Sequence, residues 1–381
     1  MKSLIVDKIS SVTIGNEIGR KIRISADIPC EEGIIIAVKI LNNKSRYNTL
    51  ELTSGRMAQI KKGDIIVGAL GHRNALFGYS GHIPKKLSTG DKIQVLNLGG
   101  VLGICDSINI SQGSPFDCEV LGVVLEFPFL GERIGVPAKV GKAKKKIEEK
   151  LNLNGTPIIA IAGTCMDSGK TVAACSVISQ LNHNGIIVDA FKSTGVALRR
   201  DILAMEDAGA RNTEIFSDYG VVATTSRNSA SVTKKILNSI SIEKPDVIVC
   251  EFGDGILGAY GVESILSDKD LSKSISSIVL CANDPMGAWG GVKMLKDHFN
   301  LIPDLLTGPA TDNRISLQEI PESSPVDFSP LEYVKSTGAV EPTVAKKVKP
   351  LLILFICFSI PVSNIVVILI FKSVLDLLFI K

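Results

Sequence analysis

Aromatic side chains are scarce in this sequence, at 5% of 381 residues with a single tryptophan. Proteins that bind single-stranded nucleic acid stack its bases on aromatic rings, and this chain has few rings to offer. Basic charge is not in excess either, because 42 Lys and Arg stand against 39 Asp and Glu, a formal net charge of +3. The composition therefore predicts no nucleic-acid partner.

Paired cysteines are missing as well. The eight cysteines are scattered, with no C-x-x-C pair and no Cys/His cluster, which argues against a zinc site. Several lie in apolar runs, as Cys250 and Cys281 do. Buried free thiols fit a reducing compartment better than a disulfide scaffold. The N-terminus shows no apolar stretch long enough for a secretory signal, so we expect a cytoplasmic protein.

A long apolar run breaks with the rest of the chain near the C-terminus. Residues 350–371 carry no charge, three lysines precede the run, and one follows it. A helix needs about 20 apolar residues to cross a hydrocarbon core. The tail, residues 346–381, therefore predicts a C-terminal transmembrane helix and a membrane contact. Two alternatives stay open: a buried helix, which Pro361 and Asn364 fit badly, and an aberrant tail from a shifted reading frame.

Residues 1–135 contain short runs of β-branched residues punctuated by glycine. Four of these runs predict strands, at residues 33–40, 64–69, 92–96 and 120–125. Two similar corners, Gly63-Asp64 and Gly90-Asp91, each lead into a strand, and glycine there supplies the positive φ angle of a turn. Such corners are common in small barrels. We expect a β-rich domain with the form of a barrel or a sandwich.

The pattern changes at residues 136–154, which marks a domain boundary. This stretch is rich in lysine and glutamate and predicts a charged linker or a short helix with a solvated face. Over residues 155–345, apolar strands alternate with amphipathic helices. This alternation predicts an α/β domain whose parallel sheet is covered on both faces. Ligands of such sheets bind beyond the carboxyl ends of the strands.

The first strand-to-helix turn of this domain carries the clearest motif. An apolar strand at residues 157–162 leads through GTCMDSGKT, residues 163–171, into a helix over residues 171–182. Glycines let the backbone curl so that successive N–H groups point at phosphate oxygens, and the positive end of the helix faces the same anion. We expect Lys170 to reach the β- and γ-phosphates of ATP, and the hydroxyl of Thr171 to ligate Mg²⁺.

The loop departs from the strict spacing G-x-x-x-x-G-K-[ST]. Gly163 lies one residue too early, and Thr164 stands where the first glycine is expected. The strand–loop–helix context nevertheless favours a phosphate-binding loop, or P-loop, over a chance Gly-Lys-Thr. The nucleotide contacts predicted from this loop are Gly163, Thr164, Asp167, Ser168, Gly169, Lys170 and Thr171.

The run G-T-x-x-x-x-G-K-T resembles the phosphate loop of the dethiobiotin synthetase group of P-loop proteins. That group includes the ATPase domains of the cobyrinate amidases, with the partition ATPases and the nitrogenase iron protein as more distant relatives. The resemblance covers residues 155–312. Lys192, in the run FKSTG, resembles a lysine that faces the substrate, and Asn313 lies where the group places a loop near the base. Asp201 and Glu251 are similar to its two magnesium carboxylates.

The resemblance therefore implies a catalytic set of Lys170, Lys192 and Glu251, and a magnesium set of Thr171, Asp201 and Glu251. From the residues alone, one hydroxyl and one or two carboxylates suffice, because Mg²⁺ prefers oxygen ligands and keeps several waters. Interpretations without a functional role also stay open for these residues. Glu251 fits an ordinary loop acid, Asp201 a helix surface, and Lys192 an exposed loop lysine.

The sequence also departs from that group. Cys165 and Met166 stand where its synthetases usually carry an acidic residue and a threonine, and Asp254 adds a carboxylate where small residues are usual. The N-terminal domain is foreign to the minimal synthetase. These differences leave the ATPase prediction in place, but they weaken the transfer of a biotin-pathway substrate.

Three functions stay open from the sequence. The first is an ATP- and Mg²⁺-dependent enzyme of ligase or synthetase type, which phosphorylates a small carboxylate-like substrate. Lys170 and Lys192 would neutralise charge on the transferred group. The second is a nucleotide-dependent switch or adaptor acting on a protein partner, tethered through residues 350–371. The third is a P-loop retained for structure alone. The resembled group often places active sites at dimer interfaces, which implies a homodimer.

Overall fold

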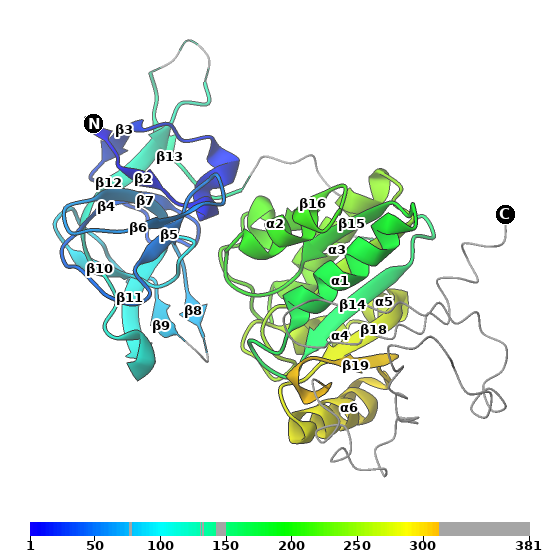
Figure 1. Ribbon diagram of the computed structural model, residues 1–381. Coiled ribbons are helices and arrows are strands. Elements are labelled where there is room, and N and C mark those ends of the chain that lie inside the picture. Colours follow the sequence, from blue (N-terminus) through cyan, green and yellow to red (C-terminus); the bar gives the residue numbers. More distant parts are fainter. Residues whose placement is uncertain (76–77, 130, 132, 142–149, 312–381) are drawn as a thin grey trace, which may run out of the picture.

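The computed structural model describes residues 1–75, 78–129, 131, 133–141 and 150–311. A β-rich region lies beside an α/β region (Figure 1). The strands of the β-rich region are β1 (Lys2–Ile5), β2 (Lys8–Ile9), β3 (Lys21–Ser25), β4 (Ile35–Ile40), β5 (Thr49–Glu51), β6 (Met57–Gln59), β7 (Ile65–Leu70), β8 (Arg73–Asn74), β9 (Tyr79–His82), β10 (Lys92–Val95), β11 (Val101–Ile108), β12 (Asp117–Glu126) and β13 (Val136–Pro137). Two 3₁₀ helices, η1 (Ser11–Asn16) and η2 (Ile110–Gln112), complete it.

Five of these strands close into a ring. β12 pairs with β4, β4 with β7, β7 with β11, β11 with β10, and β10 returns to β12. Closure pairs both edges of each of these strands, which an open sheet would leave exposed. The β-rich region is therefore a small barrel, and the four strands predicted there correspond to β4, β7, β10 and β12.

Alternating β-branched and aliphatic residues fill the barrel. Side chains that are fully buried inside it include Ile36, Val38, Ile66, Leu102 and Val120. Along β4 the neighbours Ile35 and Ala37 are buried in a second cluster instead, which continues into the α/β region. Because side chains alternate across a strand, β4 faces the barrel interior on one side and this shared core on the other.

The two Gly-Asp corners adopt the same turn. Gly63 has a φ angle of 95° and Gly90 one of 94°, in the left-handed region that glycine occupies readily. In each turn the aspartate accepts a hydrogen bond from the backbone N–H three residues earlier, at 2.7 Å for both Asp64 and Asp91. The repeated corner in the sequence is thus a repeated capped turn in the structure.

Strand pairing and backbone hydrogen bonds extend the β-rich region to Val140. β13 pairs with β12, Ile34 forms a bridge with Lys139, and the backbone N–H of Val140 donates to the carbonyl of Gly33 at 2.9 Å. The first residues of the predicted linker therefore belong to the barrel sheet. Residues 142–149 lie outside the described residues, and the domain limits at 135, 154 and 345 stay predictions.

The α/β region is built on six parallel strands in the order β16–β15–β17–β14–β18–β19. They are β14 (Ile158–Gly163), β15 (Val188–Lys192), β16 (Thr213–Ile215), β17 (Val247–Glu251), β18 (Ile275–Cys281) and β19 (Leu305–Thr307). The helices are α1 (Lys170–His183), α2 (Arg200–Asp207), α3 (Ser229–Ile242), α4 (Val262–Ser267), α5 (Lys269–Ser274), α6 (Pro285–Phe299), η3 (Phe216–Tyr219) and η4 (Pro309–Thr311). Every residue of β14 and β17 is buried, as expected for a sheet covered on both faces. The predicted α/β domain with a parallel sheet, preceded by a β-rich region, is therefore confirmed.

Helix α1 follows the predicted pattern closely. Gly169 precedes it with a φ angle of 89°, which a side chain would strain. The helix ends at the Asn184-Gly185 pair, where Gly185 has a φ angle of 78°. Its predicted inward face is buried and consists of Ala174, Val177, Ile178 and Leu181. This apolar stripe fixes the direction of α1, and its first turn therefore starts at the carboxyl end of β14.

The cysteines in the described part of the chain are free thiols, in agreement with the sequence. Within residues 1–75, 78–129, 131, 133–141 and 150–311, no helix is long and apolar enough to cross a bilayer. The predicted anchor at residues 350–371 lies outside the described residues, and so does Asn313.

Candidate functional site

The loop between β14 and α1 closes around its own lysine side chain. The ammonium of Lys170 donates to the carbonyl of Cys165 at 2.7 Å and to the hydroxyl of Ser168 at 3.4 Å. A methyl carbon placed on Gly163 would lie 2.7 Å from Cδ of Lys170. Gly163 therefore leaves room for the lysine stem, which explains a glycine one residue before its usual place.

The rest of this loop has the shape that an anion site requires. Asp167 and Gly169 have φ angles of 59° and 89°, so the backbone curls through two left-handed residues. The backbone N–H of Thr164 donates to the carbonyl of Cys281 at 2.9 Å, which ties the start of the loop to β18. The 14 residues of α1 follow, with the positive end of the helix at the loop. The chain therefore brings backbone amides, a helix terminus and a lysine ammonium together.

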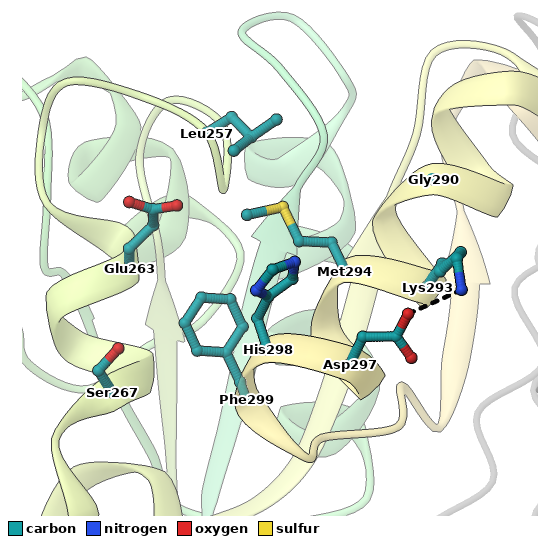
Figure 2. A pocket seen from close by; sticks show the side chains of 9 residues that line it. All are labelled: Leu257, Glu263, Ser267, Gly290, Lys293, Met294, Asp297, His298 and Phe299. Carbon is teal, nitrogen blue, oxygen red and sulfur yellow. Dashed lines mark hydrogen bonds and ion pairs between the residues drawn. The ribbon is translucent and has the colours of Figure 1, made fainter.

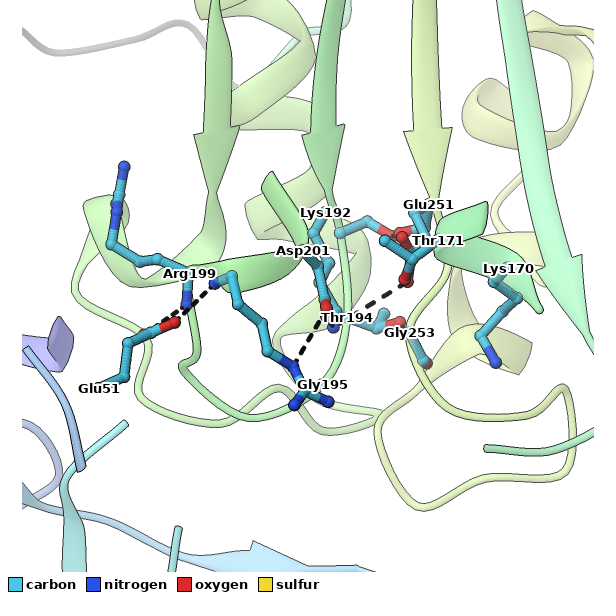
Figure 3. Close-up of polar contacts among 12 residues, drawn as sticks. Glu51, Lys170, Thr171, Lys192, Thr194, Gly195, Arg199, Asp201, Glu251 and Gly253 are labelled. Atoms are coloured by element: carbon cyan, nitrogen blue, oxygen red, sulfur yellow. Dashed lines mark hydrogen bonds and ion pairs between the residues drawn. The ribbon is translucent and has the colours of Figure 1, made fainter. Parts of the chain in front are cut away.

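Three further predicted residues meet beside this loop (Figure 3). The hydroxyl of Thr171 donates to Oε1 of Glu251 at 3.2 Å, and Nζ of Lys192 lies 4.0 Å from the same oxygen. Lys192 and Glu251 are register partners at the carboxyl ends of β15 and β17. Asp201, on α2, forms a hydrogen-bonded ion pair with Lys192. The structure thus brings together the residues that the sequence predicted for catalysis and magnesium. Asn313, predicted as a nucleotide contact near the base, lies outside the described residues.

Burial and the neighbouring charges shift the pKa values of these side chains in opposite directions. Burial lowers the pKa of Lys170. Burial would also lower the pKa of Lys192, but Asp201 and Glu251 outweigh it and hold that pKa above its ordinary value. Burial would raise the pKa of Asp201, but the Lys192 ammonium holds it below its usual range. Glu251 is different, because burial raises its pKa and Lys192 offsets this only in part.

The oxygen atoms of this group fit a magnesium ion. Oε2 of Glu251 is buried and has no hydrogen-bond partner, so one carboxylate oxygen remains for a cation. The hydroxyl of Thr171 and the carboxylate of Asp201 complete a set of hard oxygen ligands, which Mg²⁺ prefers over nitrogen and sulfur. No group of three or more His, Cys, Asp or Glu side chains that could hold a metal ion occurs in the described part of the chain, so a magnesium ion here would rest on two carboxylates, a hydroxyl and water.

Asp254, which the sequence shows as an additional carboxylate close to Glu251, belongs to the same site. Its side chain lies in the loop after β17 and is 8% exposed, and neither carboxylate oxygen has a hydrogen-bond partner. Its φ angle of 70° is unusual for a residue with a side chain. Burial raises its pKa, while Lys170 and Lys192 act in the opposite direction. A buried carboxylate without a partner destabilises a fold, so this residue has the character of a functional group.

Glycines in the loop that follows Glu251 allow this loop to pack closely against its neighbours. A methyl carbon on Gly253 would lie 2.7 Å from Cε of Lys192, and one on Gly255 would lie 2.6 Å from the carbonyl of Thr164. The loop after β17 therefore packs against both the P-loop and the Lys192 loop. Gly308 also approaches the P-loop, because a methyl carbon placed on it would lie 2.5 Å from the carbonyl oxygen of Ser168.

A separate cavity of about 660 Å³ lies between α4 and α6 (Figure 2). Its lining mixes apolar side chains with an ion pair of Lys293 and Asp297 at 2.7 Å. The lining residues are Leu257, Glu263, Ser267, Gly290, Lys293, Met294, Asp297, His298 and Phe299. This cavity shares no residue with the P-loop group, and we assign it no role in nucleotide binding.

Comparison with known proteins gives no family. No family model matches the chain, and no curated protein matches it. Among solved structures, the chain is similar to the signal recognition particle receptor FtsY from Elizabethkingia anophelis, with 14% identity, a TM-score of 0.29, and coverage of 41% of this chain and 48% of FtsY. It is similar to the hydrogenase maturation factor HypB from Archaeoglobus fulgidus, with 18% identity, a TM-score of 0.28, and coverage of 40% and 64%. The kinase domain of the Escherichia coli tyrosine kinase ETK gives 14% identity, a TM-score of 0.30, and coverage of 40% and 68%.

The chain thus spans about half of FtsY and under two thirds of HypB, and TM-scores this low carry no weight here. The class of the protein follows from its own geometry. A parallel six-stranded sheet, with a Gly-Lys-Thr loop between its strand β14 and helix α1, has the architecture of a P-loop nucleotide-binding domain. In this chain a small β-barrel precedes that domain.

Proposed function

We propose that this protein is an ATP- and Mg²⁺-dependent enzyme that activates a small carboxylate-like substrate by phosphoryl transfer, in the manner of a synthetase or ligase. One observation carries the proposal. Five residues from four elements, α1, β15, α2 and β17, converge beside one loop at the carboxyl ends of parallel strands: Lys170, Thr171, Lys192, Asp201 and Glu251. This is where α/β proteins bind ligands.

Each residue has a role in the proposed reaction. The P-loop amides and Lys170 bind the triphosphate, and Thr171, Asp201 and Glu251 would hold Mg²⁺. A magnesium ion held there would supply positive charge that stabilises the phosphates during transfer. Lys192 neutralises Asp201 in this structure. After Lys170, its ammonium is the second positive group that could stabilise the transferred phosphoryl group. The acceptor oxygen would attack the γ-phosphorus, and ADP would leave.

The dethiobiotin-synthetase-like character belongs to this proposal. It is supported by the placement of Lys192, Asp201 and Glu251 around Thr171, which is what the sequence resemblance implies. The resemblance to the synthetase group also implies a homodimer. A cytoplasmic location and a membrane contact through residues 350–371 rest on the sequence alone, and we keep all three as proposals.

The proposal is tested by release of ADP from full-length protein with ATP and Mg²⁺, across a panel of small mono- and dicarboxylates. We expect at least one carboxylate to raise the rate of ADP release well above the rate with water alone. The proposal fails if the protein binds ATP–Mg²⁺ but no carboxylate changes turnover. A Lys192→Met protein, at a temperature where it is folded and still binds ATP, should lose the carboxylate-dependent rate.

A second function, a nucleotide-dependent switch acting on a protein partner, is favoured by one observation. Glu32 of the barrel accepts hydrogen bonds from the backbone N–H groups of Val222 and Ala223, both at 3.1 Å. Segments of the α/β region are therefore bound to the barrel, and a change at the nucleotide could reach it. Slow turnover that accelerates only with a protein partner or membranes would support this function over the first.

A further inference from the structure

A carboxylate of the barrel is bound to the helix that carries Asp201. Glu51, the last residue of β5, is fully buried. Its Oε2 accepts a hydrogen bond from the backbone N–H of Arg199 at 2.8 Å, and its Oε1 accepts one from the backbone N–H of Arg200 at 2.7 Å. The hydroxyl of Ser11 donates to Oε2 as well. Figure 3 shows Glu51 reaching this turn from the barrel side.

These bonds replace a cap that helix α2 does not supply for itself. Arg199 is the N-cap residue of α2, and its side chain makes no capping hydrogen bond. The first N–H groups of a helix have no partner within the helix, so an outside acceptor stabilises the helix start. A carboxylate is a favourable acceptor there because of the helix dipole. Glu51 thus provides the cap from a residue 148 positions away in the sequence.

The capped turn leads directly into the nucleotide site. Asp201 follows Arg200 and is ion-paired with Lys192, which lies 4.0 Å from Glu251. If the start of α2 moved away from the barrel, Glu51 would lose its two backbone donors, and hydrogen bonds to a charged acceptor are among the stronger ones. The position of Asp201 is therefore coupled to the barrel through Glu51.

The neighbouring contact between the two regions is also close. A methyl carbon on Gly99 would lie 2.0 Å from the carbonyl of Ala197, two residues before the N-cap of α2. Glu51 itself is held in place, because its backbone N–H donates to the carbonyl of Leu98 at 2.8 Å. The barrel therefore approaches the segment between Lys192 and Asp201 at two adjacent places.

We infer that Glu51 is a positioning residue for the nucleotide site: it fixes the start of α2 so that Asp201 faces Lys192 and Glu251, and it makes the β-barrel a required part of the magnesium site. This inference rests on the proposed function. It assigns the barrel a role in metal-dependent nucleotide binding, beyond any contact it makes with a substrate. The magnesium dependence of the protein should consequently respond to a side chain that touches neither nucleotide nor metal.

The test compares Glu51→Gln with Glu32→Gln in the full-length protein. The first substitution keeps the shape but replaces one acceptor oxygen with an NH₂ group, and the second alters the other barrel carboxylate, which binds Val222 and Ala223 away from α2. Affinity for ATP is measured by calorimetry with EDTA and across a Mg²⁺ titration, and melting temperatures are recorded. For Glu51→Gln we expect the half-maximal Mg²⁺ concentration to rise roughly five- to tenfold, as for loss of a helix cap, with metal-free ATP affinity changed less than about twofold.

Other outcomes decide against the inference. If Glu51→Gln lowers the melting temperature but leaves the Mg²⁺ midpoint unchanged, Glu51 is structural only. If Glu32→Gln shifts the midpoint equally, the effect is a general loosening of the interface. If the unaltered protein binds no ATP with or without Mg²⁺, the proposed function fails and the inference fails with it. Should Glu51→Gln not fold, Ser11→Ala removes another donor to the same carboxylate, and an unshifted midpoint there also overturns the inference.

Discussion

The hydroxyl of Thr171 donates a hydrogen bond to Oε1 of Glu251 at 3.2 Å, and this bond joins the first turn of α1 to the carboxyl end of β17. The two residues are 80 positions apart in the sequence. They meet because β14 and β17 are adjacent parallel strands, with Ile161 in register with Glu251. The other oxygen of Glu251 is buried without a partner, so the pair presents a hydroxyl and a carboxylate oxygen to one site.

Replacement of Thr171 by valine should weaken magnesium-dependent nucleotide binding. Valine keeps the shape of threonine and removes only the hydroxyl, whose interaction with a charged partner is worth about 1.5–3 kcal/mol. We expect affinity for ATP–Mg²⁺ to fall about tenfold or more, while affinity in EDTA stays nearly constant. Thr171→Ser is the matched control and should bind like the unaltered protein. Equal loss in both variants would contradict a role for the hydroxyl.

Lys192→Met should destabilise the folded protein strongly in the absence of ligands. The side chains of Lys192 and Asp201 are 12% and 15% exposed, so the substitution leaves a nearly buried carboxylate without its cation. Breaking such a pair costs about 3–5 kcal/mol, which urea unfolding measures. Lys293→Met, in a pair that is about half exposed with Asp297, should leave the free energy of unfolding nearly unchanged. If the two variants unfold alike, Lys192 is not the counter-charge of Asp201.

Addition of Asp201→Asn to Lys192→Met should restore much of the lost stability. The double variant has neither the buried carboxylate nor its ammonium, and paired residues of this kind are not additive. It should still be unable to carry out phosphoryl transfer, since both groups belong to the proposed site. Restored stability together with restored turnover would show that neither residue acts in the reaction.

Asp254→Asn should stabilise the protein at neutral pH. Burial raises the pKa of Asp254 above its ordinary 3.8, so the unfolded chain ionises first as the pH rises. Stability is therefore lost between pH 3.8 and the raised pKa, and the substitution removes this loss. We expect the melting temperature to rise by a few degrees at pH 7, and the gain to shrink toward pH 4.

Asp207→Asn, which alters an exposed residue on α2, serves as the control for this substitution and should leave the melting temperature nearly unchanged at pH 7. If Asp254→Asn lowers the melting temperature at pH 7, the carboxylate is stabilising and its assignment as a functional group is wrong. Turnover of ATP should fall in Asp254→Asn despite its greater stability, as for residues whose strain serves function.

The local parts of this structure follow from the sequence. The apolar run of β14, the glycine before α1 and the apolar stripe of α1 are readable because strand and helix periodicities act within a few residues. The Gly-Asp corners are readable for the same reason. The site residues Lys192, Asp201 and Glu251 were predicted through a resemblance, and the structure supplies the reason that they meet: each lies at or just beyond the carboxyl end of a parallel strand.

Polar contacts between residues far apart in the sequence produce no local pattern from which they could be predicted. Glu51 looks like any acidic residue near a turn, and its partners lie 148 and 149 positions further on. Asp254 is visible as an extra carboxylate, but its burial depends on how the loop after β17 folds over the P-loop. The closure of the barrel likewise depends on β10 pairing with both β11 and β12, which no local pattern specifies.

The central claim is that Lys170 and its loop enclose a triphosphate. Calorimetric titration of the full-length protein with ATP and Mg²⁺, beside the Lys170→Ala variant, tests this most directly. Loss of a charged hydrogen-bond donor to a phosphate should reduce affinity about tenfold or more, so we expect clear binding to the unaltered protein and binding at least that much weaker to the variant. Equal affinity of the two proteins for ATP–Mg²⁺, or no binding to either, would contradict the account.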